Sequence, residues 1–165
     1  MKLAEQRHIA ADPAVAWAAM LNREVLRQCV PGCERLTGSV GQGFEPVVVQ
    51  KVGPVKARFS GKVTLSDIEE GRSLRIEGEG QGGVAGYAKG GANVAMVPAD
   101  GGGTTLTYDV DANVGGKIAQ LGSRIIDSFA SGMAGQFIDR FQNTIEAPGA
   151  NDDAGPDAQT DAAGV

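Results

Sequence analysis

The sequence predicts an α+β fold in which a curved antiparallel sheet wraps around a long C-terminal helix, with two short helices after the first strand. Residues 115–145 carry apolar side chains every three or four positions, which is the period of one helix face. Between residues 44 and 114, apolar and polar side chains alternate in several stretches, which is the period of a strand. Turns rich in glycine and proline separate those stretches and favour antiparallel pairing of neighbours.

The first elements are expected to be a strand at residues 2–10 and two short helices. Asp12 is a suitable N-cap, and Pro13 suits the first position of the helix that follows. A second helix is expected over residues 22–29, because Pro31 cannot continue it.

Further strands are expected over residues 44–52, 55–65, 73–79, 84–97 and 104–114. In the second of these, Phe59 and Val63 share a face with aliphatic residues, and charged and hydroxyl side chains occupy the other face. The sheet should therefore have one buried and one solvated face.

The helix expected over residues 115–145 would be roughly 45 Å long at 1.5 Å per residue. Its apolar stripe includes Ile125, Phe129, Met133 and Phe137, and a second stripe beside it includes Ala134 and Ile138. So much apolar surface requires a large apolar partner, which the sheet provides.

Composition favours one domain over residues 1–146 and a tail over residues 147–165. The chain has 165 residues and 42% hydrophobic content, enough to bury one core. The tail is rich in Ala, Gly and Asp, so we expect it to be disordered and dispensable for folding. Neither an apolar run of spanning length nor a signal peptide is apparent, so a cytoplasmic location is expected. Without a basic stripe, nucleic acid is not an expected partner.

Three chemical signals are weak. Cys29 and Cys33 flank a turn that could join their sulfurs, but reduced buried thiols are favoured, and two thiols with a single histidine make a metal site improbable. His8 has no obvious acid or nucleophile partner, so a structural role is favoured. The glycines of residues 78–83 match G-x-G-x-x-G, yet a strand follows where a nucleotide-binding helix should begin.

Small residues occupy the expected inward face of the strand at residues 84–97, at Gly86, Ala88, Gly90 and Ala92. We favour the interpretation that they leave a cavity between sheet and helix. The alternative is that glycines relieve crowding where a curved sheet bends.

On the outer face, Lys62 and neighbouring bases mix with Glu77 and Glu79. A solvated surface is favoured there over a docking patch.

We expect no catalytic or metal-binding residue, because the inward side chains are apolar and Tyr108 is their only clear polar tip. The residues expected to line a ligand-binding cavity are Phe59, Val63, Leu74, Ile76, Ala88, Ala92, Tyr108, Ile125, Phe129, Met133 and Phe137.

Three motifs, at residues 29–33, 52–61 and 115–124, resemble the carbon monoxide dehydrogenase G-subunit family of the START-like (SRPBCC) helix-grip superfamily. The resemblance covers residues 1–146 and implies a helix-grip fold. It also implies an accessory role beside aerobic carbon monoxide dehydrogenases and related molybdenum hydroxylases, outside their catalytic core. The role implied is recruitment of the enzyme to the membrane or transfer of a quinone between them.

Together these observations predict a noncatalytic accessory protein that binds a hydrophobic small molecule, preferably a respiratory quinone, and serves a molybdenum hydroxylase. Its short acidic tail has no apolar face, so membrane contact at the inner face of the cell membrane should be transient and through the cavity mouth. A fatty acid is a rival ligand, because Lys117 or Arg124 could bind its carboxylate. Rival functions are an assembly adaptor with a filled core and a cyclase- or lyase-type enzyme, which would need a polar pair inside.

Overall fold

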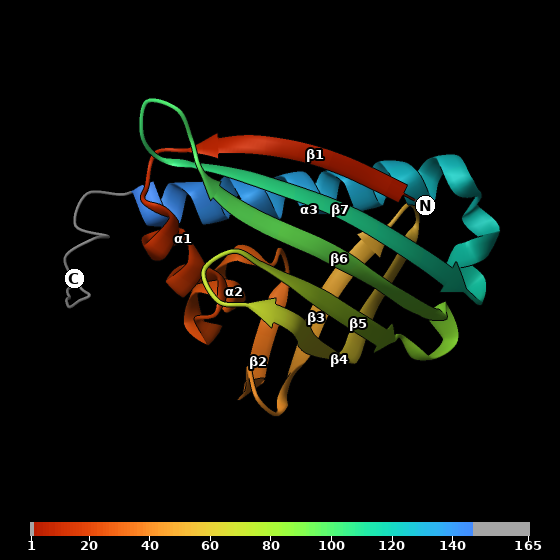
Figure 1. Cartoon of the computed structure of the whole chain (residues 1–165). Coiled ribbons are helices and arrows are strands. Elements are labelled where there is room, and N and C mark those ends of the chain that lie inside the picture. Colours follow the sequence, from red (N-terminus) through yellow and green to blue (C-terminus); the bar gives the residue numbers. More distant parts are fainter. Residues whose placement is uncertain (1, 147–165) are drawn as a thin grey trace.

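The computed structural model describes residues 2–146, so the expected tail lies outside the described residues (Figure 1). Its strands are β1 (Lys2–Ile9), β2 (Cys33–Ser39), β3 (Gly43–Val52), β4 (Val55–Glu69), β5 (Ser73–Gln81), β6 (Tyr87–Pro98) and β7 (Thr104–Gly115). Its helices are α1 (Pro13–Met20), α2 (Arg23–Cys29) and α3 (Ser123–Glu146), with short 3-10 turns η1 (Gly83–Ala85) and η2 (Lys117–Leu121).

The strands form one antiparallel sheet in the order β1-β7-β6-β5-β4-β3-β2. Figure 1 shows this sheet strongly curved, with α3 lying along its inner side and α1 and α2 near one end of α3. The predicted α+β architecture, a curved sheet around a C-terminal helix, is confirmed.

The long helix begins later than the sequence pattern predicted. Gly116 has φ 78° and Gly122 has φ 94°, values that no residue of a right-handed helix adopts. The segment from residue 115 is therefore divided into η2 and α3, and the regular helix begins at Ser123. Apolar periodicity alone did not reveal these breaks.

Two strand boundaries also differ from expectation. The strand expected from residue 84 begins at Tyr87, because Gly83 (φ 63°) and Gly86 (φ 112°) flank the η1 turn. Gly86 thus lies outside the sheet rather than on its inward face. Strand β2 was not predicted, since its sequence lacks a clean apolar alternation.

The two short helices begin close to where the sequence predicted. Asp12 occupies the N-cap position of α1, with an extended backbone and no hydrogen bond from its side chain, and Pro13 opens the helix. Asn22 Oδ1 accepts a hydrogen bond from the amide of Val25 at 3.1 Å, which caps α2.

Helix α1 is anchored to the interior by its tryptophan. Trp17 is buried in the core, and its Nε1 donates a hydrogen bond to Glu70 Oε2 at 2.8 Å. The indole therefore buries its apolar surface while its one polar group keeps a partner.

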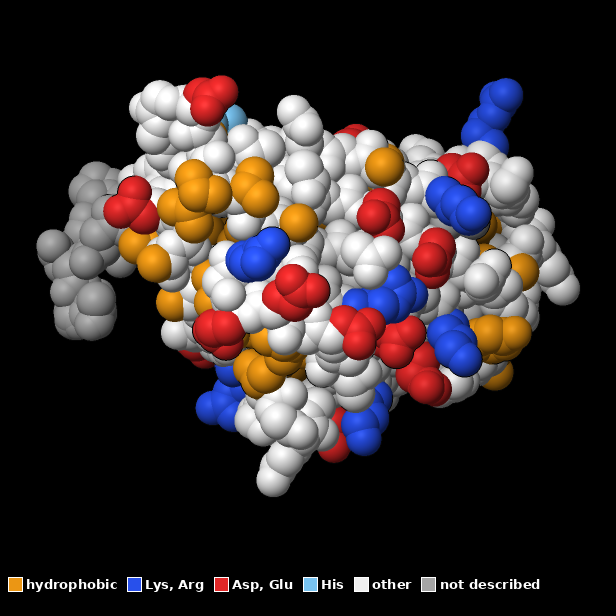
Figure 2. All heavy atoms as spheres, viewed as in Figure 1, with side chains coloured by type: hydrophobic (Ala, Val, Ile, Leu, Met, Phe, Trp, Pro, Cys, Tyr) orange, Lys and Arg blue, Asp and Glu red, His pale blue; other side chains and the backbone are white. Residues whose placement is uncertain are grey.

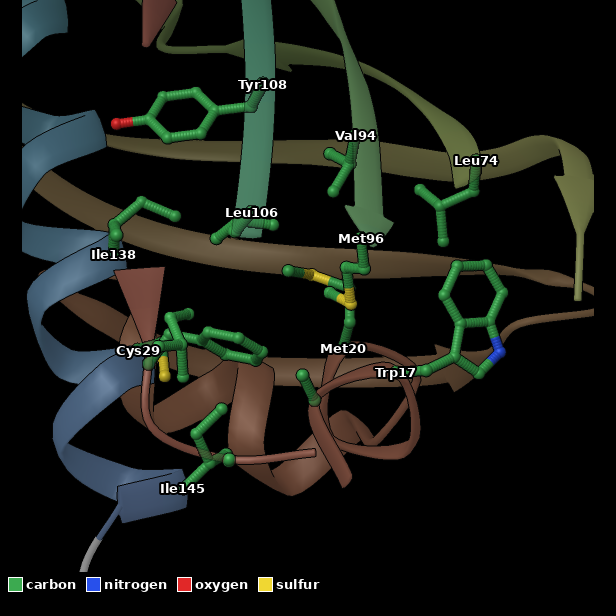
Figure 3. Packing of buried hydrophobic residues seen from close by; sticks show 14 residues of the cluster. Trp17, Met20, Cys29, Leu74, Val94, Met96, Leu106, Tyr108, Ile138 and Ile145 are labelled. Carbon is green, nitrogen blue, oxygen red and sulfur yellow. The ribbon is translucent and has the colours of Figure 1, made fainter. Parts of the chain in front are cut away.

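The interior contains two apolar clusters. The larger one joins α1, α2 and the C-terminal half of α3 to strands β5–β7, and Figure 3 shows Trp17, Met20, Leu106 and Ile138 within it. The second cluster contains Val52, Ala85 and Ile118, so it joins the β3–β4 turn to η1 and η2. The candidate site lies within the larger cluster.

Candidate functional site

A cavity of about 220 Å³ lies between the inner face of the sheet and α3. Its walls come from α1, from strands β5, β6 and β7, and from the middle of α3. The lining residues are Met20, Ile76, Ala92, Val94, Leu106, Tyr108, Val110, Ala134, Phe137 and Ile138. Figure 3 shows the aromatic ring of Tyr108 directed toward α3, above Leu106 and Ile138. Apart from the Tyr108 hydroxyl, the lining side chains are apolar.

Four of the residues expected in the walls line this cavity: Ile76, Ala92, Tyr108 and Phe137. Phe137 stacks on the buried Phe141 with ring centroids 6.3 Å apart. Leu74 is buried in the surrounding cluster without lining the cavity.

The other expected wall residues lie elsewhere. Phe59 and Phe129 pack in the second cluster. Ile125 is 39% exposed at the start of α3, and Met133 is half-buried on the same helix. The structure therefore divides the expected wall between two ends of the interior.

The structure also adds wall residues that the sequence pattern did not assign to the cavity. Ala134 and Ile138 belong to the second apolar stripe of α3, so that stripe was the available signal. Met20 comes from α1, and no periodicity in the sequence relates that short helix to the sheet.

Two rows of small residues separate the cavity from the second cluster. In strand register, the first row is Val63, Gly78, Gly90 and Ala112, and the second is Gly61, Gly80, Ala88 and Val114. The cavity row beside them is Leu65, Ile76, Ala92 and Val110. Residues directly opposite in a sheet share a face, so both rows look toward α3. Val63 and Ala88, both expected in the wall, lie in these rows.

Some glycines of these rows relieve crowding between strands, and one leaves space on the inner face. A Cβ added at Gly61 or Gly90 would overlap a carbonyl oxygen of the neighbouring strand, so these two permit the bend of the sheet. A Cβ at Gly80 would meet nothing nearer than Phe59 Cβ at 3.8 Å. Gly80 therefore leaves space on the inner face.

A polar seam that includes Tyr108 of the cavity wall lies where β1 meets α3. The Tyr108 hydroxyl donates a hydrogen bond to Glu5 Oε1 at 2.7 Å. Next along β1, Arg7 Nη1 lies 2.5 Å from Asp139 Oδ1 and donates to Gln142 Oε1 at 3.2 Å. Glu5 and Arg7 alternate in phase with the apolar residues of β1, a signal that sequence analysis overlooked. Tyr108 is thus not the only polar group near the interior.

The pKa of Tyr108 is raised to about 12, first by burial and then by its hydrogen bond to Glu5. The phenol stays protonated across the physiological range, because a neutral tyrosine is favoured beside a carboxylate and away from water. Tyr108 therefore keeps its one proton at the cavity wall and donates it to Glu5.

The C-terminal end of α3 is attached to the end of β1. Glu146 Oε2 accepts a hydrogen bond from the amide of Ala10 at 2.6 Å, and Gln142 Nε2 donates to the carbonyl of His8 at 3.2 Å. The bond to Ala10 is the main reason that the pKa of Glu146 is lowered. Among the hydrogen bonds found in the described residues, the His8 ring has one partner, the carbonyl oxygen of Gly102 at 3.0 Å.

The two cysteines are separate thiols in the structure. Cys29 is buried in the larger cluster, and Cys33 Sγ donates to the carbonyl of Arg35 at 3.3 Å. Burial raises the pKa of both thiols. Within residues 2–146, no group of three or more His, Cys, Asp or Glu side chains could hold a metal ion.

The outer face of the sheet carries a mixture of charges (Figure 2). Arg75 bonds to Glu77 at 3.3 Å and to Asn93 at 3.1 Å, and Asn93 in turn donates to Asp109 at 2.9 Å. A shallow hollow of about 540 Å³ on this face is lined mostly by charged and polar groups. These paired charges agree with a solvated surface.

Comparison with protein families identifies one match. The profile of CoxG, the family of the carbon monoxide dehydrogenase G subunit, matches residues 6–146. The chain belongs to this family. Membership suggests an accessory role beside a carbon monoxide dehydrogenase. A search among curated proteins gives no match.

Solved structures share the helix-grip fold of this family member. A conserved protein from Geobacillus kaustophilus has a TM-score of 0.82 at 21% identity, over 88% of this chain and 95% of that one. An uncharacterised protein from Rhizobium leguminosarum has a TM-score of 0.69 at 17% identity, over 88% and 94%. A protein from Thermus thermophilus has a TM-score of 0.64 at 14% identity, over 89% and 98%. At these identities the likeness concerns the fold alone.

None of the helices within residues 2–146 has the length and apolar character needed to span a membrane.

Proposed function

We propose that this protein is a noncatalytic carrier that binds the head group of a respiratory quinone in the cavity and delivers it to a molybdenum hydroxylase of the carbon monoxide dehydrogenase type. The observation that carries the proposal is an apolar cavity with one polar group on its wall, the Tyr108 hydroxyl, which is hydrogen-bonded to Glu5. Family membership supports the choice of a redox enzyme as the partner.

The size of the cavity suits a head group rather than a whole ligand. Its volume of about 220 Å³ is below the range of roughly 300–1,000 Å³ typical of sites that enclose drug-sized molecules. An isoprenoid tail needs an apolar path leading away from the head. A tail that left the cavity for the second cluster would cross the two rows of small residues, where Gly80 leaves space on the inner face.

The polar seam fits both redox forms of a quinone. The Tyr108 hydroxyl has a single proton, which it donates to Glu5 in the structure, so donation to a quinone carbonyl would replace that bond. The Glu5 carboxylate is able to accept from a quinol hydroxyl. A fatty-acid carboxylate would meet repulsion from Glu5 at this position. Its favourable position is at Lys117 and Arg124, on the far side of the small rows, with the acyl chain in the cavity.

The chemistry of Tyr108 favours binding over catalysis. A general base operates best with a pKa near the working pH, and the pKa of Tyr108 is about 12. The Tyr108–Glu5 pair is the polar pair that a cyclase- or lyase-type enzyme would need, but the Tyr108 phenol stays protonated at neutral pH. An adaptor without a ligand would be expected to fill its interior with side chains, whereas this protein keeps a cavity of about 220 Å³ there.

A titration tests the proposal directly. Trp17, the single tryptophan of the chain, packs in the cluster that surrounds the cavity, so decylubiquinone bound there should quench its fluorescence. Ala92→Leu should fill the cavity and weaken quenching at least tenfold. Ala95→Leu is the matched control, since Ala95 shares strand β6 but faces outward. Equal affinity in both variants, or binding of palmitate with no binding of decylubiquinone, would overturn the proposal.

A further inference from the structure

One end of the molecule is built from segments far apart in sequence. The β3–β4 turn, η1, η2 and the first turn of α3 meet there around the second cluster, and Figure 1 shows them at the right-hand side. Gly53 in the β3–β4 turn lies against Leu121 and Ile125. A Cβ added at Gly53 would lie 3.5 Å from a methyl carbon of Leu121 and 3.7 Å from one of Ile125. Hereafter the η1–η2 end denotes Lys51, Lys56, Val84, Tyr87, Lys117, Arg124 and Ile125.

Apolar side chains protrude from this end. Three of the five large exposed hydrophobic residues in the described part of the chain belong to it: Val84 (93% exposed), Tyr87 (47%) and Ile125 (39%). Val84 stands beside the buried Ala85, so η1 presents one aliphatic side chain outward on a turn fixed from within. Figure 2 shows hydrophobic side chains at the surface where the β5–β6 connection lies.

The same end carries exposed basic side chains. Lys51 and Lys56 lie directly opposite each other in the β3–β4 pair, where like charges destabilise a sheet. Lys117 and Arg124 are exposed on η2 and α3. Segments 51–56, 83–87 and 115–126 contain no acidic residue, and Asp127 directly follows the last of them. An anionic partner would relieve this repulsion.

We propose that the η1–η2 end docks on the surface of a bilayer that contains anionic lipids. Lysine is depleted in protein–protein interfaces, which disfavours an acidic protein as the partner. Lysine near an anionic bilayer is attracted to the headgroups, and tyrosine is enriched at the membrane–water boundary. An end that carries a protruding valine together with exposed bases therefore fits a lipid surface better than a protein surface.

This inference rests on the proposed carrier function and gives it a direction. The rows of small residues lie between the cavity and the second cluster, which underlies the η1–η2 end. Docking by this end would place that path toward the bilayer, from which a quinone has to be taken.

Flotation of the full chain with vesicles tests the docking surface. One set of vesicles is phosphatidylcholine alone, and the other contains roughly a third phosphatidylglycerol. We expect binding to the anionic vesicles only, and a loss of binding in 0.5 M NaCl because salt screens surface charge. Lys51→Gln with Lys56→Gln should lower the partition coefficient about fivefold per base. The control pair is Lys62→Gln with Lys89→Gln, on the outer face of the sheet.

The apolar contribution has its own matched pair. Val84→Ser should lower the partition coefficient several-fold, whereas Val97→Ser, at a 49% exposed position outside this end, should not. Both positions are exposed, so neither change should disturb folding.

Equal binding to both vesicle types, absence of binding, or equal effects of test and control variants would overturn the docking surface. Quenching by decylubiquinone in detergent is measured separately. Quenching without vesicle binding overturns only this inference, and vesicle binding without quenching overturns only the carrier function.

Discussion

The phenol of Tyr108 donates a hydrogen bond to Oε1 of Glu5, 2.7 Å away, across the antiparallel pair of β7 and β1. The two residues are directly opposite in that pair, so both side chains lie on the inner face of the sheet. The contact places a donor and an acceptor at the edge of an otherwise apolar cavity. It is therefore the polar end of the proposed quinone site.

Replacing Tyr108 by Phe tests this polar end. The change keeps the ring in the cavity wall and removes one hydrogen-bond donor, which is worth about 0.5–1.5 kcal/mol, so decylubiquinone should bind about three- to tenfold more weakly. Tyr87→Phe, at an exposed position, is the control and should leave affinity unchanged. Unchanged affinity in Tyr108→Phe would place the head group elsewhere.

The same residue predicts how stability falls at high pH. The pKa of Tyr108 is raised from 10.0 to about 12, so folding favours the protonated phenol. This contribution to stability is complete below about pH 10 and is lost as the pH rises through about 12. Urea unfolding at pH 9 and pH 11.5 should show a steeper loss in the wild type than in Tyr108→Phe. Parallel losses would contradict the assignment.

Replacement by alanine should affect stability differently at Gly90 and at Gly80. A Cβ at Gly90 would overlap the carbonyl oxygen of Asp111, so Gly90→Ala should destabilise by about 1–3 kcal/mol as an overpacked site. A Cβ at Gly80 has ordinary contact distance to Phe59, so Gly80→Ala should be neutral or slightly stabilising. Chemical denaturation measures both. A large loss in Gly80→Ala would mean that the inner face has no room at this row.

Glu146 predicts part of the acid dependence of stability. Its pKa is lowered chiefly by the amide of Ala10, so its contribution is present above the ordinary carboxyl pKa and is lost as the pH falls through the lowered value. Glu146→Gln should reduce the stability difference between pH 7 and pH 3, whereas Glu45→Gln, an exposed change on β3, serves as the control. Faster hydrogen exchange at the Ala10 amide in Glu146→Gln should accompany it.

Much of the fold could be predicted because period-two and helical patterns are strong in this chain. The inner faces of β4 and β7 and the position of α2 follow from local sequence. The start of α3 could not be predicted from apolar spacing, because the break at Gly122 depends on backbone conformation. Strand β2 has no apolar face and forms by pairing with β3.

The candidate site was predicted less completely than the fold. Ile76, Ala92, Tyr108 and Phe137 followed from strand and helix faces. Met20 did not, since no periodicity relates α1 to the sheet, and Glu5 was overlooked although it alternates in phase with the apolar residues of β1. Sequence periodicity identifies which face is buried but not where along that face a cavity remains.

The most direct test of the carrier account is to identify what the protein holds when it is purified from its own host. An organic extract of the protein would be examined by ultraviolet difference spectra before and after reduction with borohydride. The account predicts the redox difference of a quinone in the wild-type extract, and its loss in Ala92→Leu prepared in the same way. An extract that contains only fatty acid, from a protein that does not bind added decylubiquinone, would contradict it.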